Sequence, residues 1–192
     1  MKIKINTIGT KDVIRKLNQL KGQSESALKK VVNDFKRRAP GWIAKDITQT
    51  YNAKKKDVKG SMRSQGEGLD AEVNIHGRVL SLAHFGLKPK ERPRKMSYPV
   101  SAEIFKGNRS TYDRLTTFVH NGTAFTRRDE SGQIVGQVVG KDGKKHNYFR
   151  ILDTLSVPQM AGNEDVSKAI SEDVNKQLMK RAEHYLKYYL NK

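Results

Sequence analysis

Five histidines and twenty acidic residues are the first candidates for metal or acid–base chemistry in this sequence. No two histidines are four residues apart, which is the spacing of a helical zinc site. His120-Asn121 and His146-Asn147 would suit a small metal-dependent nuclease, but no acidic group is placed to share the metal. The pattern therefore favours turn and surface histidines, and no metal is expected. The histidines are His76, His84, His120, His146 and His184.

Nucleophilic and phosphate-binding motifs are equally weak. Ser156 lacks the Gly-x-Ser-x-Gly context of a nucleophile elbow. The segment "GQVVG" at 136–140 is typical of a strand bounded by glycines, not of a phosphate loop. The chain has no cysteine, which excludes thiolate ligands, disulfides and cysteine catalysis. We therefore expect a protein that is not an enzyme and has no cofactor.

Positive charge is the strongest compositional signal. The net charge is +18 and the mean hydropathy is −0.76. Such a field attracts nucleic acid, anionic membranes or acidic proteins. A lysine run is typical of a solvated helix face, whereas a loop stiffened by two prolines either contacts DNA or an acidic partner, lines a pore, or is simply exposed. The candidate contacts are Lys54, Lys55 and Lys56 in the run, and Lys88, Lys90, Arg92, Arg94 and Lys95 in the loop. Arg127 and Arg128 precede Asp129 and Glu130, which predicts a local ion pair.

Helical periodicity appears at both ends of the chain. The first pattern is "KDVIRKLNQL" (11–20), which is interrupted at Gly22. The second, 24–39, has Ser24 as a candidate cap and is expected to end or kink at Pro40-Gly41, because proline lacks a backbone donor. A short helix is expected after Asn52. The last pattern follows Asn163 and has apolar residues at spacings of three and four. This stripe is Val166, Ile170, Val174, Leu178, Ala182, Tyr185 and Tyr189.

Alternation with a period of two predicts strands in the middle of the chain. The segment "LDAEVNI" (69–75) is expected to pair antiparallel with "VLSLAHF" (79–85). Pro99 makes the next strand an edge strand or delays its start. Further strands are expected in "TTFVHNG", "QIVGQVVG" and "HNYFRIL", with a hairpin turn at Asp142-Gly143.

The order of these elements predicts the α+β class, with an antiparallel β-sheet packed with N-terminal helices and a long C-terminal helix. We expect one domain, 1–192, made of a basic helical region (1–65), a sheet region (66–155) and a connector with the last helix (156–192). The N-terminus lacks the apolar stretch of a signal peptide, and no apolar run is long enough to span a bilayer. A soluble protein made in the cytoplasm is expected.

The chain contains "SLAHFG", "FVHNGTAFTRR" and "LSVPQM" in this order. In these segments and their order it resembles the minor tail protein Z family of long-tailed bacteriophages and prophages, whose members are also called tail completion proteins. The resemblance covers roughly residues 13–189. It implies a virion structural protein that acts late in tail assembly at the head-proximal end and allows head–tail joining and DNA passage. The implied partners are further copies of itself, as in a ring, other tail and head–tail connector proteins, and DNA without sequence preference; no membrane is implied.

The implied location is the virion tail, assembled in the cytoplasm of a bacterial host. Two other hypotheses remain open: a stand-alone basic nucleic-acid-binding protein and the small metal-dependent nuclease. "LSVPQM" is expected to aim the last helix, because Pro158 fixes its own backbone and biases Val157 toward an extended conformation. Its apolar residues would pack in the core of one chain or at a seam between subunits. These residues are Leu155, Val157, Pro158 and Met160.

Overall fold

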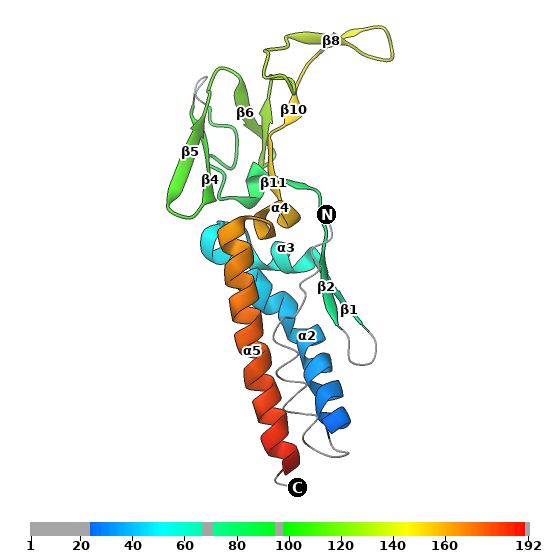
Figure 1. Cartoon of the computed structure of the whole chain (residues 1–192). Helices are drawn as coiled ribbons and strands as arrows, with labels where there is room; N and C mark the ends of the chain where they lie inside the picture. The colour runs from blue at the N-terminus through cyan, green and yellow to red at the C-terminus, as the bar shows by residue number, and fades with distance from the viewer. Residues whose placement is uncertain (1–23, 67–70, 95–97, 191–192) are drawn as a thin grey trace. The chain divides into compact units, whose positions relative to one another are not determined.

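The structure of the protein is a computed structural model that describes residues 24–66, 71–94 and 98–190 (Figure 1). The chain divides into two compact units. The helical unit takes its described residues from Met1–Gln49, Lys55–Gly77 and Val157–Lys192, and the β unit consists of Thr50–Lys54 and Arg78–Ser156. Both helices and antiparallel strands are present, so the predicted α+β class is confirmed.

Two long helices, α2 (Ser24–Thr50) and α5 (Glu164–Leu190), form the core of the helical unit together with the short helices α3 (Lys55–Gly60) and α4 (Val157–Ala161). The predicted stripe of α5 is confirmed from Val166 to Ala182, whose apolar members are all buried. Tyr185 is half-buried, and the side chain of Tyr189 lies outside the described residues. Asn163 caps α5, because its side-chain oxygen accepts a hydrogen bond from the Val166 N–H at 3.3 Å.

The helix expected at 11–20 lies outside the described residues. Of the two outcomes expected at Pro40-Gly41, an end or a kink, the end is wrong, because α2 continues through Pro40 to Thr50. Proline removes one backbone donor and crowds the preceding turn, at about 3 kcal/mol or more in a helix interior. Beyond this point Ile43 and Ile47 are fully buried. Each such side chain contributes about 1.5–3 kcal/mol on burial, so packing on both sides of Pro40 offsets the local penalty.

A hairpin of β1 (Met62–Gln65) and β2 (Glu72–Ile75) completes the helical unit. Met62 pairs with Ile75, and Val73 and Ile75 are buried, as the alternation of this segment predicted. The predicted partner strand is wrong, however. The segment at 79–85 forms β3 (Val79–Ser81) and a single 3₁₀ turn, and β3 pairs with β11 (Asp153–Ser156).

Within the described residues the strands form five small antiparallel sheets, where one sheet was expected. In the β unit, β4 (Val100–Phe105) pairs with β5 (Asn108–Tyr112), and β6 (Thr117–His120), β7 (Thr123–Thr126) and β10 (Arg150–Ile151) form a sheet in the order β10-β7-β6. The pair of β8 (Gln137–Val139) and β9 (Lys145–Asn147) is the hairpin predicted around Asp142-Gly143. Strand β4 begins directly after Pro99, as expected.

The β6–β7 hairpin turns at Asn121 and Gly122, which both have positive φ (47° and 71°). Positive φ at both central residues is the requirement of a two-residue type I′ turn, and Asn-Gly is the sequence that meets it most readily. This turn fixes the register, so that Phe118 lies opposite Phe125. The core of the β unit is made of buried apolar residues from several strands and turns: Tyr51, Leu82, Phe85, Leu87, Val100, Ala102, Val119 and Ala124.

Candidate functional site

The predicted basic loop, defined here as residues 86–94, is attached firmly to strand β4. The backbone of Lys88 both donates to and accepts from the backbone of Ser101, with N–O distances of 2.8 Å. The Arg109 guanidinium of β5 donates to the Gly86 carbonyl at 3.1 Å. A loop held at its base in this way presents its side chains from a fixed backbone.

All four described basic residues of this loop are exposed: Lys88, Lys90, Arg92 and Arg94. Across the described ranges of the chain, none of them forms an ion pair, so their charges are not neutralised by carboxylates there. Lys95 lies outside the described residues. At its far end the loop approaches the β6–β7 turn, since a Cβ at Gly122 would lie 4.0 Å from the Lys90 carbonyl oxygen. Exposed cations of this kind attract anions.

The lysine run is divided between the two units. Lys54 belongs to the β unit, whereas Lys55 and Lys56 begin α3 of the helical unit. All three side chains are exposed, and Val58 is the buried residue of α3. This arrangement agrees with the expectation of a solvated helix face.

The segment "LSVPQM" is not an extended connector. Leu155 is half-buried in β11, and Val157 already begins helix α4, with Pro158 as its second residue. Proline fits here because the first turn of a helix has no intrahelical use for its N–H groups. Val157 and Met160 are 0% exposed, so these side chains are core residues in the single chain.

The sheet β10-β7-β6 carries an aromatic face, defined here as Phe118, Phe125, Phe149 and Ile151. The rings of Phe118 and Phe125 are stacked with centroids 5.6 Å apart, and Phe149 meets both rings edge-on at 6.1 and 5.6 Å. Phe149 is 55% exposed and Ile151 is 44% exposed. The sequence contained the signal for this cluster, because the Asn-Gly turn sets Phe118 opposite Phe125, but the cluster was not predicted.

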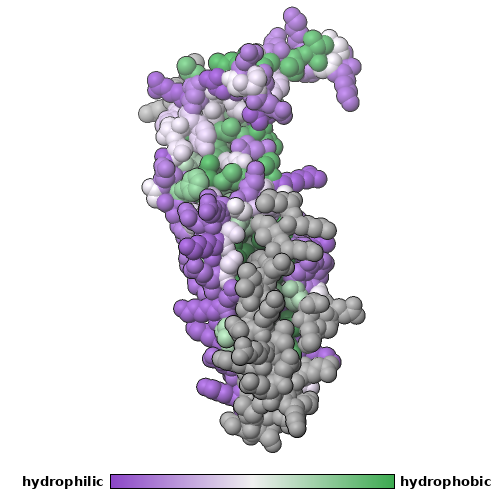
Figure 2. All heavy atoms as spheres, viewed as in Figure 1, coloured by the Kyte–Doolittle hydropathy of each residue, from purple (hydrophilic) through white to green (hydrophobic). Residues whose placement is uncertain are grey.

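The hairpin β8–β9, residues 137–147, is called the arm. Except for the half-buried Gly140, all of its residues are exposed, and these include the apolar Val138 and Val139. Ile134, which precedes the arm, is 61% exposed. In Figure 2 hydrophobic surface, coloured green, lies at the upper right, where Figure 1 labels β8. Exposed valines on a two-stranded hairpin have no core to join within the arm itself, which is unusual for a segment that functions alone.

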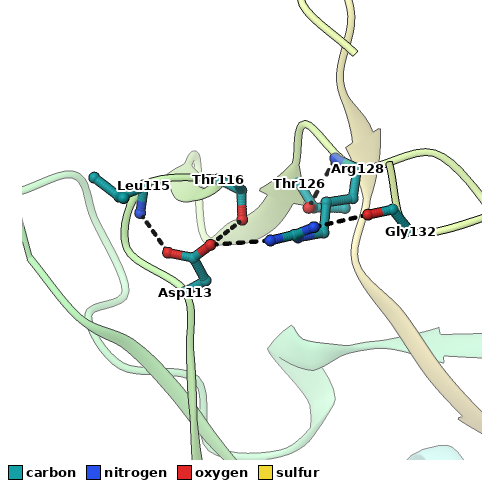
Figure 3. Close-up of polar contacts among 6 residues, drawn as sticks. All are labelled: Asp113, Leu115, Thr116, Thr126, Arg128 and Gly132. Carbon is teal, nitrogen blue, oxygen red and sulfur yellow. Dashed lines mark hydrogen bonds and ion pairs between the residues drawn. The ribbon is translucent and has the colours of Figure 1, made fainter. Parts of the chain in front are cut away.

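Asp113 and Arg128 hold the turn at 129–132, which precedes the arm in the chain (Figure 3). The Asp113 carboxylate accepts hydrogen bonds from the Leu115 N–H at 2.9 Å, the Thr116 hydroxyl at 3.1 Å and Arg128 at 3.3 Å. Arg128 also donates to the Gly132 carbonyl at 2.7 Å. The hydrogen bond from Leu115, followed by those from Thr116 and Arg128, holds the pKa of Asp113 below its ordinary value.

The predicted ion pair of Arg127 and Arg128 with the acidic residues after them is therefore wrong. Arg128 pairs with Asp113, and the Asp129 carboxylate instead accepts from the Ser131 hydroxyl at 2.7 Å and the Gln133 N–H at 2.9 Å. A carboxylate so close in sequence satisfies its own turn first, because these local bonds need little ordering of the chain. The arginine is left to reach a more distant acid.

Two buried acids of α2 have opposite environments. Asp34 pairs with Arg37 at 2.7 Å, Arg38 at 2.8 Å and Arg181 of α5 at 3.4 Å. Burial alone would raise the pKa of Asp34, but the bonds from Arg38 and Arg37 and the charges of Arg38 and Arg181 hold it below its ordinary value. This cluster joins α2 to α5 and pairs the charge of Asp34 with arginines, although both hydrogen bonds go to Oδ1. The Oδ2 atom has no hydrogen-bond partner among the described residues and faces Arg181 as an ion pair only.

Asp46 lies twelve residues further along α2 and is 6% exposed. Its Oδ2 atom, like Oδ2 of Asp173 on α5, is buried without a hydrogen-bond partner among the described residues. Burial raises the pKa of Asp46, and the negative charge of Asp173 raises it further, against the opposing charges of Lys45 and Lys55. The pair is a weak point of the helical unit.

The described part of the chain contains no group of three or more histidine, cysteine or acidic residues that could hold a metal ion. In the same ranges, no helix combines the length and the apolar composition that crossing a membrane requires. Comparison of the chain with models of protein families, with curated proteins and with solved structures finds no match in any of the three.

Proposed function

We propose that this protein is a structural component of a phage virion, a minor tail or tail completion protein that acts late in tail assembly at the head-proximal end and allows head–tail joining and DNA passage. The observation that carries the proposal is the arm, whose valines and open strand edges have no partner within the hairpin. The order of "SLAHFG", "FVHNGTAFTRR" and "LSVPQM" in the sequence supports it, because it resembles the order in the minor tail protein Z family.

The arm supports an assembly role on energetic grounds. An isolated two-stranded hairpin is marginally stable in water, and its free edges invite pairing with another chain. Burying Val138 and Val139 against a neighbour would contribute about 1.5–3 kcal/mol per fully buried side chain. The partners expected from this surface are further copies of the chain and other tail or head–tail connector proteins.

The basic loop supports the DNA-passage part of the proposal. Its four described cations are exposed and form no ion pair in the described ranges. Exposed lysines and arginines contact phosphates without reading sequence, and their contribution falls as salt rises. Such a surface suits a wall along which DNA must move and not be held at one site.

The proposal is tested by substituting both arm valines, Val138→Thr and Val139→Thr, which keeps the β-branched shape and replaces one methyl of each side chain by a hydroxyl. We expect unchanged thermal unfolding, loss of the self-associated species in sedimentation velocity, and failure to restore infectious particles to a phage that lacks the gene. Val79→Thr is the matched control, because Val79 is 48% exposed on β3 of the same unit. Normal assembly by the double variant contradicts the role of the arm.

Immunogold labelling of purified virions tests the location directly, with label expected at the head-proximal end of the tail. The second candidate function, a stand-alone nucleic-acid-binding protein, is favoured by the net charge of +18. It requires tight binding by the isolated monomer and no label on virions. The proposed tail protein instead gives weak, salt-sensitive binding that does not depend on DNA sequence.

A further inference from the structure

The aromatic face lies on the solvent side of its sheet. Side chains alternate between the two faces of a strand, and the inward positions are Val119 on β6 and Ala124 on β7, both 0% exposed. Phe118 and Phe125 are paired across these strands, and Ile151 of β10 is paired with Phe125. All three therefore point away from the core of the β unit.

The register places Phe149 and Arg127 at one end of this face. Ile151 pairs with Phe125 and Arg150 with Thr126, so the next position in the ladder sets Phe149 opposite Arg127. Arg127 is two residues beyond Phe125 and projects from the same side. Its side chain is exposed and, within the described part of the chain, forms neither an ion pair nor a hydrogen bond. One end of the apolar surface thus has a free cation.

The other end of the face lies near the backbone of the basic loop. The Asn121-Gly122 turn lies there, and a Cβ placed on Gly122 would be 4.0 Å from the Lys90 carbonyl oxygen. His120 pairs with Thr123, and Arg127 follows Thr123 by four residues. At 3.3 Å per residue, the two ends of the face are therefore about 13 Å apart along the strand. That length fits two or three stacked bases, which is what aromatic residues on a sheet bind in single-stranded recognition modules.

We propose that the aromatic face is a binding platform for single-stranded nucleic acid. Bases stack on Phe149 and the neighbouring rings, and a phosphate at one end of the face contacts Arg127. Flat, partly exposed rings suit unpaired bases, because the faces of bases in a duplex are already covered by their neighbours. The positive rim attracts a polyanion, whereas a second copy of this chain would bring equal positive charge to the same rim. This inference is independent of the proposed virion role.

The test is fluorescence anisotropy with labelled oligothymidylate and oligouridylate of about 15 nucleotides and a duplex of equal length. A net charge of +18 gives salt-sensitive binding to any nucleic acid, so the stacking contribution is measured at about 200 mM salt, where the electrostatic part is weakened. Phe149→Leu keeps an apolar side chain and removes the ring. We expect about tenfold weaker binding of single strands and unchanged binding of the duplex.

Phe105→Leu is the matched control, because Phe105 is 44% exposed on β4 and packs on Tyr51, away from this face. It leaves single-strand binding unchanged. Arg127→Gln lowers the slope of log affinity against log salt by about one. Tighter binding of oligouridylate identifies RNA as the ligand, and tighter binding of oligothymidylate identifies DNA.

Two results overturn the proposal. One is a Phe149→Leu protein that binds single strands as tightly as the parent. The other is a Phe149→Leu protein whose sedimentation shows altered self-association while its oligonucleotide binding is intact, since this assigns the face to a second copy of the chain. Far-UV circular dichroism of each variant establishes that the fold is retained.

Discussion

Asp46→Asn is expected to stabilise the helical unit at neutral pH, although it removes a charged residue from a long helix. The Asp46 Oδ2 atom is buried without a donor among the described residues, and the charge of Asp173 faces it. A buried acceptor without a partner costs about 1–3 kcal/mol, and more when it is charged. An asparagine carries no charge and offers a donor, so we expect a gain of about 1–2 kcal/mol in the free energy of unfolding.

The same change at Asp34, on the same helix and equally buried, has the opposite expected sign. Asp34→Asn takes the carboxylate from Arg37, Arg38 and Arg181. Hydrogen bonds to charged groups contribute about 1.5–3 kcal/mol. The three arginine side chains are 72%, 40% and 34% exposed, so water reaches them after the change. We expect a loss of about 2 kcal/mol and not the 3–5 kcal/mol of a sealed buried pair.

The pH dependence separates the two acids. The raised pKa of Asp46 means that its stabilising contribution is fully present below the ordinary value of 3.8 and is lost as pH rises through its folded pKa. The lowered pKa of Asp34 means that its contribution is present above 3.8 and is lost as pH falls through its folded pKa. The gain from Asp46→Asn should therefore shrink in acid, and the loss from Asp34→Asn should shrink in stronger acid.

Urea unfolding measured through the fluorescence of Trp42, the single tryptophan, checks both signs because Trp42 lies on α2 between the two acids. The series should run from about pH 3 to about pH 8. A destabilised Asp46→Asn protein at neutral pH would refute the assignment of an unsatisfied carboxylate. A gain that stays constant across the series would refute the raised pKa.

Four further expectations concern other parts of the molecule. Leu178→Ala should lower the free energy of unfolding by about 2–5 kcal/mol, because Leu178 is 8% exposed on α5. Pro158→Gly should lower it by about 2–3 kcal/mol, because buried surface is lost and the unfolded chain is freer. Urea titrations measure both, and an unchanged midpoint for either variant contradicts the assigned burial. Replacing the four described cations of the basic loop by serine should change stability by less than about 1 kcal/mol but lower the salt dependence of DNA binding; a collapse of the melting transition would show that the loop is structural. Arg128→Ala should speed hydrogen exchange at the backbone amides of Gly132 and Val135, which precede the arm, and should change the free energy of unfolding by about 0.2–1 kcal/mol. Unchanged exchange would mean that this segment is held by its backbone alone.

Local features were predictable because their physics acts over a few residues. The stripe of α5 follows from helical spacing, and its start follows from the Asn163 cap and the two acids after it. The turn at Asn121-Gly122 follows from the positive φ that both residues tolerate. Strand β4 begins after Pro99 because proline cannot donate to a ladder. The exposure of the loop cations follows from their charge.

Partner choice was not predictable, because it is decided by contacts between residues far apart in the chain. Alternation marked 72–75 as a strand but could not show that Met62–Gln65, and not 79–85, lies beside it. The tolerance of Pro40 depends on the burial of Ile43 and Ile47, which a local rule for proline does not contain. Arg128 reaches Asp113 because nearer acids bind their own turns.

The sequence by itself determined the class of the fold, its charge and most of the turns, because propensity, capping and solvation of charge are local. Only the tertiary structure decided which surfaces remain open. The aromatic face exists because the β10-β7-β6 register brings Phe118, Phe125 and Phe149 together. Asp34 and Asp46 have opposite environments because α5 places an arginine against Asp34 and a carboxylate near Asp46. Side-chain chemistry is set by composition, but desolvation and pairing depend on neighbours that the fold supplies.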